Sequence, residues 1–361
     1  MSDKIRKMPM IYTQTDFKKI ATRILTDWDK LGLPKIDQTK LDFKLMPIRK
    51  IGLHSLLTFM IYHAGKPAVV LKLPRYREGT IAFAALRNEA AKLKDLREKH
   101  ILSIEGPQLF RLIEIDSVPV LLMRGYEGKM LHQYIDAEND LAKVARFLRI
   151  GVDLLTTYST RTKGKKLAVN DAFIEQRLLH PVREILEYYP NQIAHLEKYL
   201  HEFLATKSWG GQTVPEVLVH HEYNPWNILL TPEGDLILLD WEDAQNNGLP
   251  FLDLYNFFMV AFRIMFYGEG SEAQQRPLAD RQTRARFLID EFRAASRKYC
   301  LALGCSESVL DLFFLIFAFE QARFFLDEKR RDVHYAESWL SLLTNTAVTD
   351  CFVDHLSREI G

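Results

Sequence analysis

The chain has 361 residues, of which 47% are hydrophobic and 26% are charged. This composition is that of an ordinary globular protein and excludes a disordered chain, collagen and a coiled coil. The 48 Lys and Arg residues balance 47 Asp and Glu residues, so overall charge does not favour nucleic acid or an anionic membrane as a partner. At about 150 residues per domain, the length predicts two or three domains or one large domain of two lobes.

Cysteine usage and hydropathy both favour a cytoplasmic protein. The three cysteines, Cys300, Cys305 and Cys351, form no CxxC pair, which fits a reducing compartment better than a disulfide framework or a zinc ribbon. The N-terminal residues contain no apolar run of signal-peptide length. The longest apolar run, 312–319, is much shorter than the roughly 20 residues of a membrane span. We therefore expect no membrane insertion.

Helix and strand patterns alternate in the first 124 residues. Apolar residues at helical spacing predict helices over 15–31 and 81–97. Short apolar runs separated by glycine and proline predict strands within 42–73, and further strands at 108–115 and 118–123. These segments predict a small antiparallel sheet with accompanying helices.

The pattern becomes mainly helical from residue 125 onward. Helical spacing continues through 141–155, through segments of 171–206, and through 252–348 apart from a polar interruption near 268–280. Strand signals return only within 217–240. We therefore expect an α+β fold with an N-terminal lobe, residues 1–124, and a helical C-terminal lobe, residues 125–361, that contains one β segment.

One lysine interrupts an apolar strand. Lys72 lies within the run Ala-Val-Val-Leu-Lys-Leu, and a lone buried ammonium group is costly, so it should find an anion. Glu89 is a suitable partner because it falls on the apolar face of the helix predicted over 81–97. The alternative is that Lys72 reaches solvent along its own aliphatic chain while Glu89 lies at the edge of its helix face.

The β segment predicts a hairpin with two oxygen ligands at its mouth. Apolar runs at 228–230 and 236–239 flank a Pro- and Gly-containing turn, so the ends of the hairpin should meet. Asn227 precedes the first strand and Asp240 follows the second. A carboxamide and a carboxylate with open positions suit Mg²⁺, which takes few protein ligands. Glu222, five residues earlier, could accept a proton from an incoming hydroxyl group.

The run His-His-Glu-Tyr-Asn-Pro-Trp-Asn over 220–227, followed by Asp-Trp-Glu-Asp over 240–243, resembles the catalytic core of the aminoglycoside phosphotransferase and choline kinase-like family. The family pattern is His-x-Asp, four residues, Asn, and then an Asp after a strand, with the spacing of the protein-kinase template. The resemblance implies a protein kinase-like fold of two lobes. It also implies an enzyme that transfers the γ-phosphate of ATP to a hydroxyl group of a small polar molecule, with Mg²⁺ as cofactor.

The resemblance implies roles for individual residues. Lys72 would hold the nucleotide phosphates and Glu89 would orient it. Residues 122–126, with Met123 and Tyr126, would form the hinge against which the adenine binds. Asn227 and Asp240 would bind Mg²⁺.

Further roles belong to the loop and the acceptor region. Glu222 would be the base that positions the acceptor hydroxyl, and Glu242 would assist the metal. His220 would be a structural histidine of the catalytic loop, and Asp253 would brace that loop. The helices after residue 254 would form the acceptor pocket.

Two departures from the family pattern leave a second function open. The position of the catalytic Asp holds Glu222, whose side chain is one methylene longer, and a misplacement of about 1 Å can cost on the order of a hundredfold in rate. The phosphate-covering segment 49–56 contains only Gly52 instead of a Gly-rich repeat. The alternative is therefore a pseudokinase that binds nucleotide or acts as a scaffold.

Other chemistries find less support. Neighbouring histidines on a strand, such as His220 and His221, point to opposite faces and do not readily share a zinc ion. No Gly-x-Ser-x-Gly motif is present, and Cys300 and Cys305 lie in a helical region without a paired histidine motif. The sequence leaves open whether the acceptor is a sugar, an amino alcohol or an aminoglycoside-like molecule. The choice between ATP and GTP and the oligomeric state also stay open.

Overall fold

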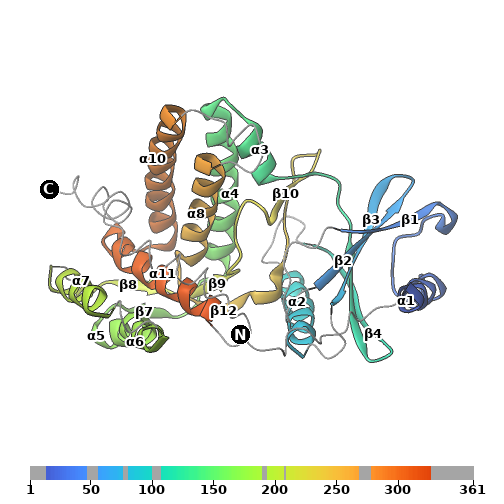
Figure 1. Cartoon of the computed structure of the whole chain (residues 1–361), viewed down its shortest axis with the longest axis horizontal. Coiled ribbons are helices and arrows are strands. Elements are labelled where there is room, and N and C mark those ends of the chain that lie inside the picture. The colour runs from blue at the N-terminus through green and yellow to red at the C-terminus, as the bar shows by residue number, and fades with distance from the viewer. Residues whose placement is uncertain are drawn as a thin grey trace. The chain divides into compact units, whose positions relative to one another are not determined.

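The structure is a computed structural model that describes residues 14–46, 56–75, 80–99, 107–188, 193–206, 209–267 and 278–326. The chain divides into two compact units (Figure 1). The first contains the chain up to Lys129 together with Asn227–Ala244, and the second contains Met130–Trp226 and the chain from Gln245 onward. The expected lobe boundary at residue 124 stays a prediction. The observed division differs from it chiefly because the β hairpin belongs to the first unit.

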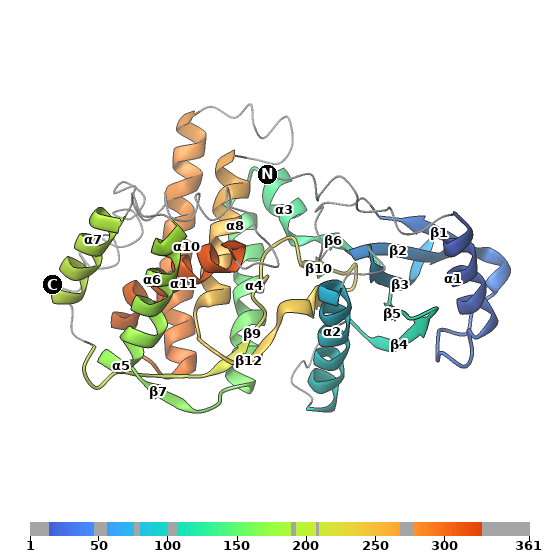
Figure 2. The same ribbon diagram turned by 60° about the horizontal axis from the view of Figure 1, so that its bottom comes forward.

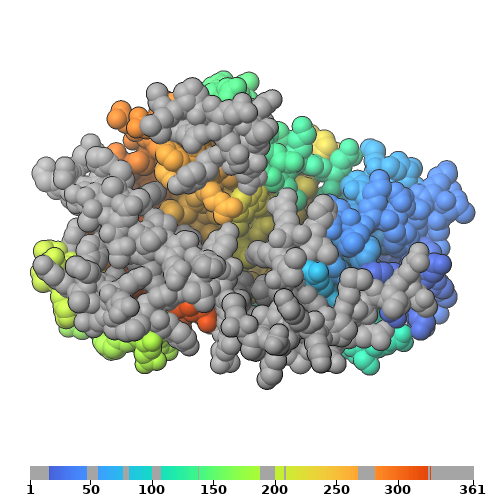
Figure 3. All heavy atoms as spheres, in the orientation of Figure 1, coloured from blue at the N-terminus to red at the C-terminus, as the bar shows by residue number. Residues whose placement is uncertain are grey.

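The first unit is built on a five-stranded antiparallel sheet, and the predicted strands are confirmed. Its order is β1-β2-β3-β5-β4. The strands are β1 (Leu41–Leu45), β2 (Leu56–His63), β3 (Lys66–Pro74), β4 (Leu109–Ile115) and β5 (Val118–Arg124). In Figure 3 the atoms of the described N-terminal residues are coloured blue.

Two helices cover opposite faces of this sheet. Alternate side chains of a strand point to opposite faces. Leu71 and Leu73 of β3 pack in the core that contains Ile24 of α1 (Gln14–Thr26), so Lys72 between them faces α2 (Thr80–Glu98). Figures 1 and 2 show α1 and α2 on either side of the strands. Strand alternation therefore directs Lys72 toward α2.

The first helix ends earlier than its periodicity predicts. α1 stops at Thr26, and the residues up to Gly32 form turns. Trp28 still packs in the core, and its indole N–H donates to the carbonyl of Pro34 at 2.8 Å. The apolar spacing therefore continues into a turn, because Trp28 reaches the same core from a non-helical backbone. A short 3₁₀ turn (Gln38–Lys40) leads into β1.

The hairpin predicted after residue 227 is also present in the first unit. β10 (Ile228–Leu230) and β11 (Leu236–Leu238) pair antiparallel with Ile228 opposite Leu238. The sheet order is β11-β10-β6, where β6 is Lys129–Met130. A 3₁₀ turn (Trp241–Asp243) follows β11.

The described part of the second unit is mainly helical, as the periodicity predicts, and the predicted helical region after residue 326 lies outside the described residues. α4 (Leu141–Arg161), α8 (Leu252–Tyr267) and α10 (Leu278–Leu303) pack beside one another in Figures 1 and 2. The other helices are α3 (Leu131–Ala137), α5 (Asp171–Ile174), a π-helical turn (Glu175–Leu179), α6 (His180–Tyr188), α7 (Ile193–Thr206), a 3₁₀ turn (Glu307–Val309) and α11 (Leu310–Leu326). Two short antiparallel pairs join β7 (Lys166–Ala168) to β8 (Thr213–Pro215) and β9 (Val217–Val219) to β12 (Gln245–Gly248).

No single described helix is long and apolar enough to cross a membrane, although the bent pair Gln282–Leu303 and Glu307–Arg323 passes the same test of length and composition.

Candidate active site

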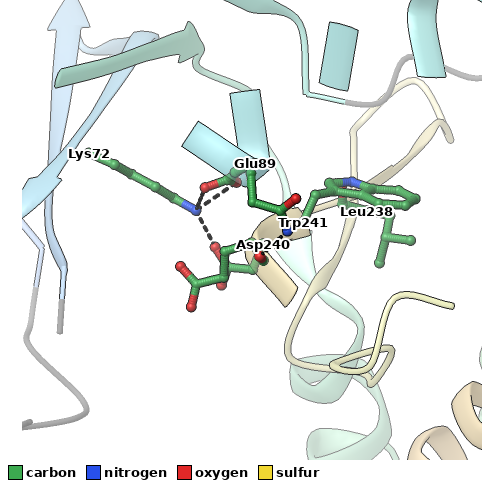
Figure 4. Close-up of polar contacts among 7 residues, drawn as sticks. Lys72, Glu89, Leu238, Asp240 and Trp241 are labelled. Carbon is green, nitrogen blue, oxygen red and sulfur yellow. Dashed lines mark hydrogen bonds and ion pairs between the residues drawn. The ribbon is translucent and has the colours of Figure 1, made fainter. Parts of the chain in front are cut away.

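The predicted ion pair between β3 and α2 is confirmed. The Nζ of Lys72 lies 2.9 Å from both carboxylate oxygens of Glu89 (Figure 4). Only 8% of the Lys72 side chain and none of the Glu89 side chain is exposed. The alternative in which Lys72 reaches solvent is therefore wrong. The pair forms because strand alternation and the helix face direct both charged groups inward.

Asp240 joins this pair from the end of the hairpin. Its Oδ1 lies 2.5 Å from the Nζ of Lys72, and its side chain is 40% exposed, unlike that of Glu89 (Figure 4). Its backbone is left-handed at φ 60°, a conformation that Asp tolerates better than most residues. Such backbone outliers concentrate at functional sites.

α2 also holds the backbone that follows Asp240. Glu89 accepts a hydrogen bond from the backbone N–H of Trp241. Asn88 donates from Nδ2 to the carbonyl of Glu242 at 2.6 Å. The buried indole of Trp241 donates to the carbonyl of Leu238 at 2.8 Å. These bonds fix where the Asp240 carboxylate points.

The ends of the hairpin meet as predicted. The backbone N–H of Leu239 donates to the carbonyl of Asn227 at 2.8 Å, one bond beyond the paired strands. Asn227 and Asp240 are both half-buried. The hairpin thus brings the backbone of a carboxamide residue alongside the segment that leads into Asp240.

The cluster contains more carboxyl groups than ammonium groups. Burial alone would lower the pKa of Lys72, but attraction to Asp240, Glu89 and Glu242 outweighs it and raises that pKa, which keeps Lys72 charged. Burial raises the pKa of Glu89 and of Glu242, and repulsion from Asp240 adds to both shifts. One ammonium group therefore faces three carboxyl groups that repel one another, and a further cation would relieve this repulsion.

The donor set fits Mg²⁺ better than a transition metal. Within the described ranges, no three His, Cys, Asp or Glu side chains gather into a metal site. Mg²⁺ needs no such cage, because it binds through one or two carboxylates and completes its shell with water and phosphate oxygens. The half-exposed Asp240 carboxylate, with Asn227 and Glu242 as further oxygen donors, meets this requirement and would hold the ion.

The expected hinge, residues 122–126, begins within β5, whose last residues pair with β3. The N–H of Gly125 donates to the carbonyl of Ala68 at 2.9 Å. A Cβ at position 125 would lie 2.9 Å from the backbone nitrogen of Ala68, so only glycine fits here. Met123 is buried, and the hydroxyl of Tyr126 accepts the N–H of Gln108 at 3.1 Å. The backbone from 122 to 126 is therefore held firmly against the sheet, and adenine binding there stays a prediction.

Glu222 lies in a loop of the second unit that is rich in local hydrogen bonds. Asn224 accepts the N–H of Trp226 and donates to the carbonyl of Glu222, both at 3.0 Å. The N–H of His132 donates to the carbonyl of Pro225 at 3.0 Å. Glu222 itself is half-buried. The loop is ordered by its own side chains, and the role of Glu222 stays a prediction.

Asp253 makes the bracing contacts that the resemblance implies. Its Oδ2 accepts the N–H of His220 at 2.7 Å, and its Oδ1 accepts the N–H of His221 at 2.9 Å. His221 has a left-handed backbone at φ 67°. Two bonds to one carboxylate hold this unusual backbone in the residues that lead into Glu222. His220 is fully buried, in keeping with the structural role expected of it.

Three residues of these networks were missed in the sequence. Tyr158 donates its hydroxyl to Asp253, Asn88 anchors Glu242, and Asn256 donates to the carbonyl of His221 at 3.1 Å. Tyr158 continues the apolar periodicity of α4, which signals burial but not a polar partner. The segment 47–55, which includes Gly52, lies outside the described residues.

The comparisons with known proteins agree with this architecture. No curated protein sequence matches the chain. The solved structures that share its fold include three that are named as aminoglycoside phosphotransferases. The first is a protein of Ralstonia eutropha provisionally assigned as an aminoglycoside phosphotransferase, with a TM-score of 0.56 and 13% identity, covering 91% of this chain and 97% of its own. The second is a thermostable mutant of aminoglycoside phosphotransferase APH(4)-Ia, with a TM-score of 0.53 and 14% identity, covering 91% of this chain and 99% of its own. The third is a mutant of aminoglycoside 2'-phosphotransferase-IIIa, with a TM-score of 0.50 and 16% identity, covering 92% of this chain and 97% of its own. The expected protein kinase-like α+β fold is thereby confirmed.

Family membership rests on the sequence itself. The model of the phosphotransferase enzyme family matches residues 51–293, more than half of the chain. This range contains Lys72, Glu89, Glu222, Asn227 and Asp240, and the resemblance read from these residues is confirmed at the level of the family. The chain belongs to the phosphotransferase enzyme family.

Proposed function

We propose that this protein transfers the γ-phosphate of ATP to a hydroxyl group of a small polar molecule, with Mg²⁺ as cofactor. The observation that supports this proposal most directly is the cluster in which the Lys72 ammonium lies 2.9 Å from Glu89 and 2.5 Å from Asp240. One structural neighbour was solved with AMP-PNP and hygromycin B and another with GDP, which supports nucleotide binding.

The cluster suits a nucleotide triphosphate. Lys72 is kept charged by its carboxylate neighbours. Its ammonium group donates to both carboxylate oxygens of Glu89 and to Asp240. In the proposed complex, Lys72 binds the phosphate oxygens and Asp240 turns from Lys72 to the metal ion. Mg²⁺, when bound, supplies neutralisation of the charge on the transferring phosphate.

Glu222 would act on the acceptor. In the proposed step a new bond forms between the acceptor oxygen and the γ-phosphorus, the bond from that phosphorus to the bridging oxygen of ADP breaks, and the hydroxyl proton passes to the Glu222 carboxylate. Phosphoryl transfer depends mainly on positioning and electrostatics, so the extra methylene of Glu is compatible with turnover. Asp253, through His220 and His221, holds the backbone that leads into Glu222.

The first experiment measures the thermal midpoint with and without Mg²⁺-ATP. Ligand at 100 times its Kd adds about 2.7 kcal/mol to the folded state, which corresponds to several degrees. We expect a Mg²⁺-dependent increase that Asp240→Asn abolishes and that Asp235→Asn, in the exposed hairpin turn, retains. No increase in the wild type at millimolar ATP would refute the nucleotide site.

The second experiment measures ADP release with a panel of sugars, amino sugars, amino alcohols and aminoglycosides. We expect one class to stimulate release, and Glu222→Gln to lower kcat by about a hundredfold with little change in ATP affinity, since removing a catalytic base costs about 10²–10⁴. A wild type that binds Mg²⁺-ATP but stays inactive, while Glu222→Asp turns over, would instead identify a pseudokinase.

A further inference from the structure

Two cysteines lie at the C-terminal end of α10. α10 ends at Leu303 and Gly304 follows in the left-handed conformation at φ 73°. The N–H of Cys305 donates to the carbonyl of Cys300 at 3.1 Å, and the N–H of Gly304 donates to the carbonyl of Leu301 at 3.2 Å. These two bonds define a Schellman motif.

The Schellman motif explains why the two thiols are neighbours. In this motif the residue three positions before the helix cap and the second residue beyond the cap form a side-chain contact, which is usually apolar. Cys300 and Cys305 hold these two positions. The Sγ of Cys305 lies 3.7 Å from the carbonyl oxygen of Cys300, and the Sγ of Cys300 lies 4.0 Å from the carbonyl oxygen of Ser306. The two side chains also interact with each other. The helix end therefore brings the two thiols together.

The two thiols differ in exposure and in electrostatic surroundings. Cys300 is 2% exposed, whereas Cys305 is half-buried. Lys163 brings its ammonium group to this helix end, where it donates to the carbonyl of Ala302 at 2.6 Å. The interaction with the Cys300 side chain and the charge of Lys163 lower the pKa of Cys305, while the same interaction and burial raise the pKa of Cys300. A partly exposed thiol near a cation is the type of cysteine that reacts with oxidants. A neighbouring thiol can then convert its sulfenic acid to a disulfide.

We propose that Cys300 and Cys305 form a reversible disulfide when the protein meets a hydroperoxide. The Cys305 thiolate attacks one peroxide oxygen, a sulfur–oxygen bond forms, the oxygen–oxygen bond breaks, and hydroxide leaves as a sulfenic acid forms. The sulfur of Cys300 then attacks the sulfur of Cys305, the sulfur–oxygen bond breaks, and the departing hydroxide takes the Cys300 proton. Two thiols lose two electrons in total, and hydrogen peroxide is reduced to two water molecules.

The surroundings indicate what the disulfide would restrain. Ser306 caps the 3₁₀ turn that leads into α11, and the indole of Trp209 donates to the carbonyl of Ser308 in that turn at 3.1 Å. A bond between Cys300 and Cys305 would tie the end of α10 to the start of this turn. The modification site is thus the α10–α11 junction of the second unit (Figure 2).

The test uses the full-length protein and one tryptic peptide. Trypsin cleaves after Lys298 and Arg323, so both cysteines lie within the single peptide 299–323, which has no internal Lys or Arg. Reduced protein is treated with hydrogen peroxide, free thiols are alkylated in denaturant, and the digest is analysed by mass spectrometry. We expect peptide 299–323 to be lighter by two hydrogens, to resist alkylation, and to regain both thiols after dithiothreitol.

Matched variants separate this pair from the third cysteine. Cys351→Ser should keep the light peptide, and Cys305→Ser should lose it. Cys300→Ser should lose it and instead give a dimedone adduct at Cys305, since the sulfenic acid then has no resolving thiol. The proposal is overturned if both thiols of wild-type peptide 299–323 stay alkylatable. It is equally overturned if Cys305 reaches the sulfinic acid while Cys300 stays a free thiol, or if the bond joins this peptide to Cys351.

Discussion

The hydroxyl of Tyr158 on α4 donates to Oδ2 of Asp253 on α8 at 2.5 Å, across 95 positions of sequence. The same oxygen accepts the backbone N–H of His220 at 2.7 Å. One buried carboxylate oxygen therefore links a helix to the loop that carries Glu222. Tyr158 is fully buried, and a buried hydroxyl without a partner would be costly.

The first prediction concerns this hydrogen bond. Tyr158→Phe should lower the free energy of unfolding by about 1.5–3 kcal/mol, because its acceptor is a charged group. Tyr223→Phe is the matched control, because that buried hydroxyl donates to the neutral carbonyl of Gly151 and its loss should cost about 0.5–1.5 kcal/mol. Urea unfolding of both variants measures the difference. Equal losses would show that Asp253 does not strengthen the bond from Tyr158.

The second prediction concerns the buried ion pair. Lys72→Met leaves Glu89 buried without its ammonium partner and should cost about 3–5 kcal/mol of stability. Replacing both residues by Met should recover much of this loss, because a buried pair can often be exchanged for apolar side chains. Lys66→Met on the same strand is the control, since its side chain is 79% exposed. A double variant that is less stable than Lys72→Met would contradict this reasoning.

The third prediction concerns the hinge glycine. Gly125→Ala should lower stability by about 1–3 kcal/mol, because the new methyl group would press on backbone atoms of β3 that cannot move aside. Gly164→Ala is the control, since its nearest heavy atom to a built Cβ is 3.6 Å away and its effect should stay within about 0.5 kcal/mol. Chemical denaturation measures both. A neutral Gly125→Ala would mean that β3 and the hinge are not in close contact.

The fourth prediction concerns pH. Burial raises the pKa of Glu320 on α11, against the attraction of His221, Arg177 and Arg323. Its carboxyl group therefore ionises more readily in the unfolded chain, and this destabilises the native protein as pH rises above about 4.3, the usual pKa of Glu. The stability of Glu320→Gln relative to the wild type should accordingly increase between pH 4 and pH 7.

Glu138 provides the opposite control for this series. Its pKa is lowered, first by the backbone N–H of Asp140. A lowered pKa contributes stability above the unfolded pKa and loses it as pH falls, so Glu138→Gln should lose stability relative to the wild type as pH rises. Urea midpoints at pH 4, 5, 6 and 7 test both variants. If the stability of both variants relative to the wild type changed in the same direction with pH, the opposite pKa shifts assigned to Glu320 and Glu138 would be refuted.

Much of the fold follows from local patterns. Strand alternation and glycine-marked turns predict the sheet, and helical spacing predicts α2, α4 and α8, because periodicity reports which face of an element is buried. The helix predicted over 15–31 ends early at Thr26, since the same spacing also fits a turn whose Trp28 packs into the core. Local sequence cannot separate these two backbones.

The candidate site likewise has features that the sequence predicts and features that only the tertiary structure shows. The identity and spacing of Lys72, Glu89, Asn227 and Asp240 are readable in the sequence, because a charge on an apolar face and a hairpin with polar ends are local signals. The contacts of Tyr158 with Asp253 and of Asn88 with Glu242 join residues 95 and 154 positions apart. Tertiary packing alone decided them, because a buried polar group bonds to whatever partner the fold brings within about 3 Å.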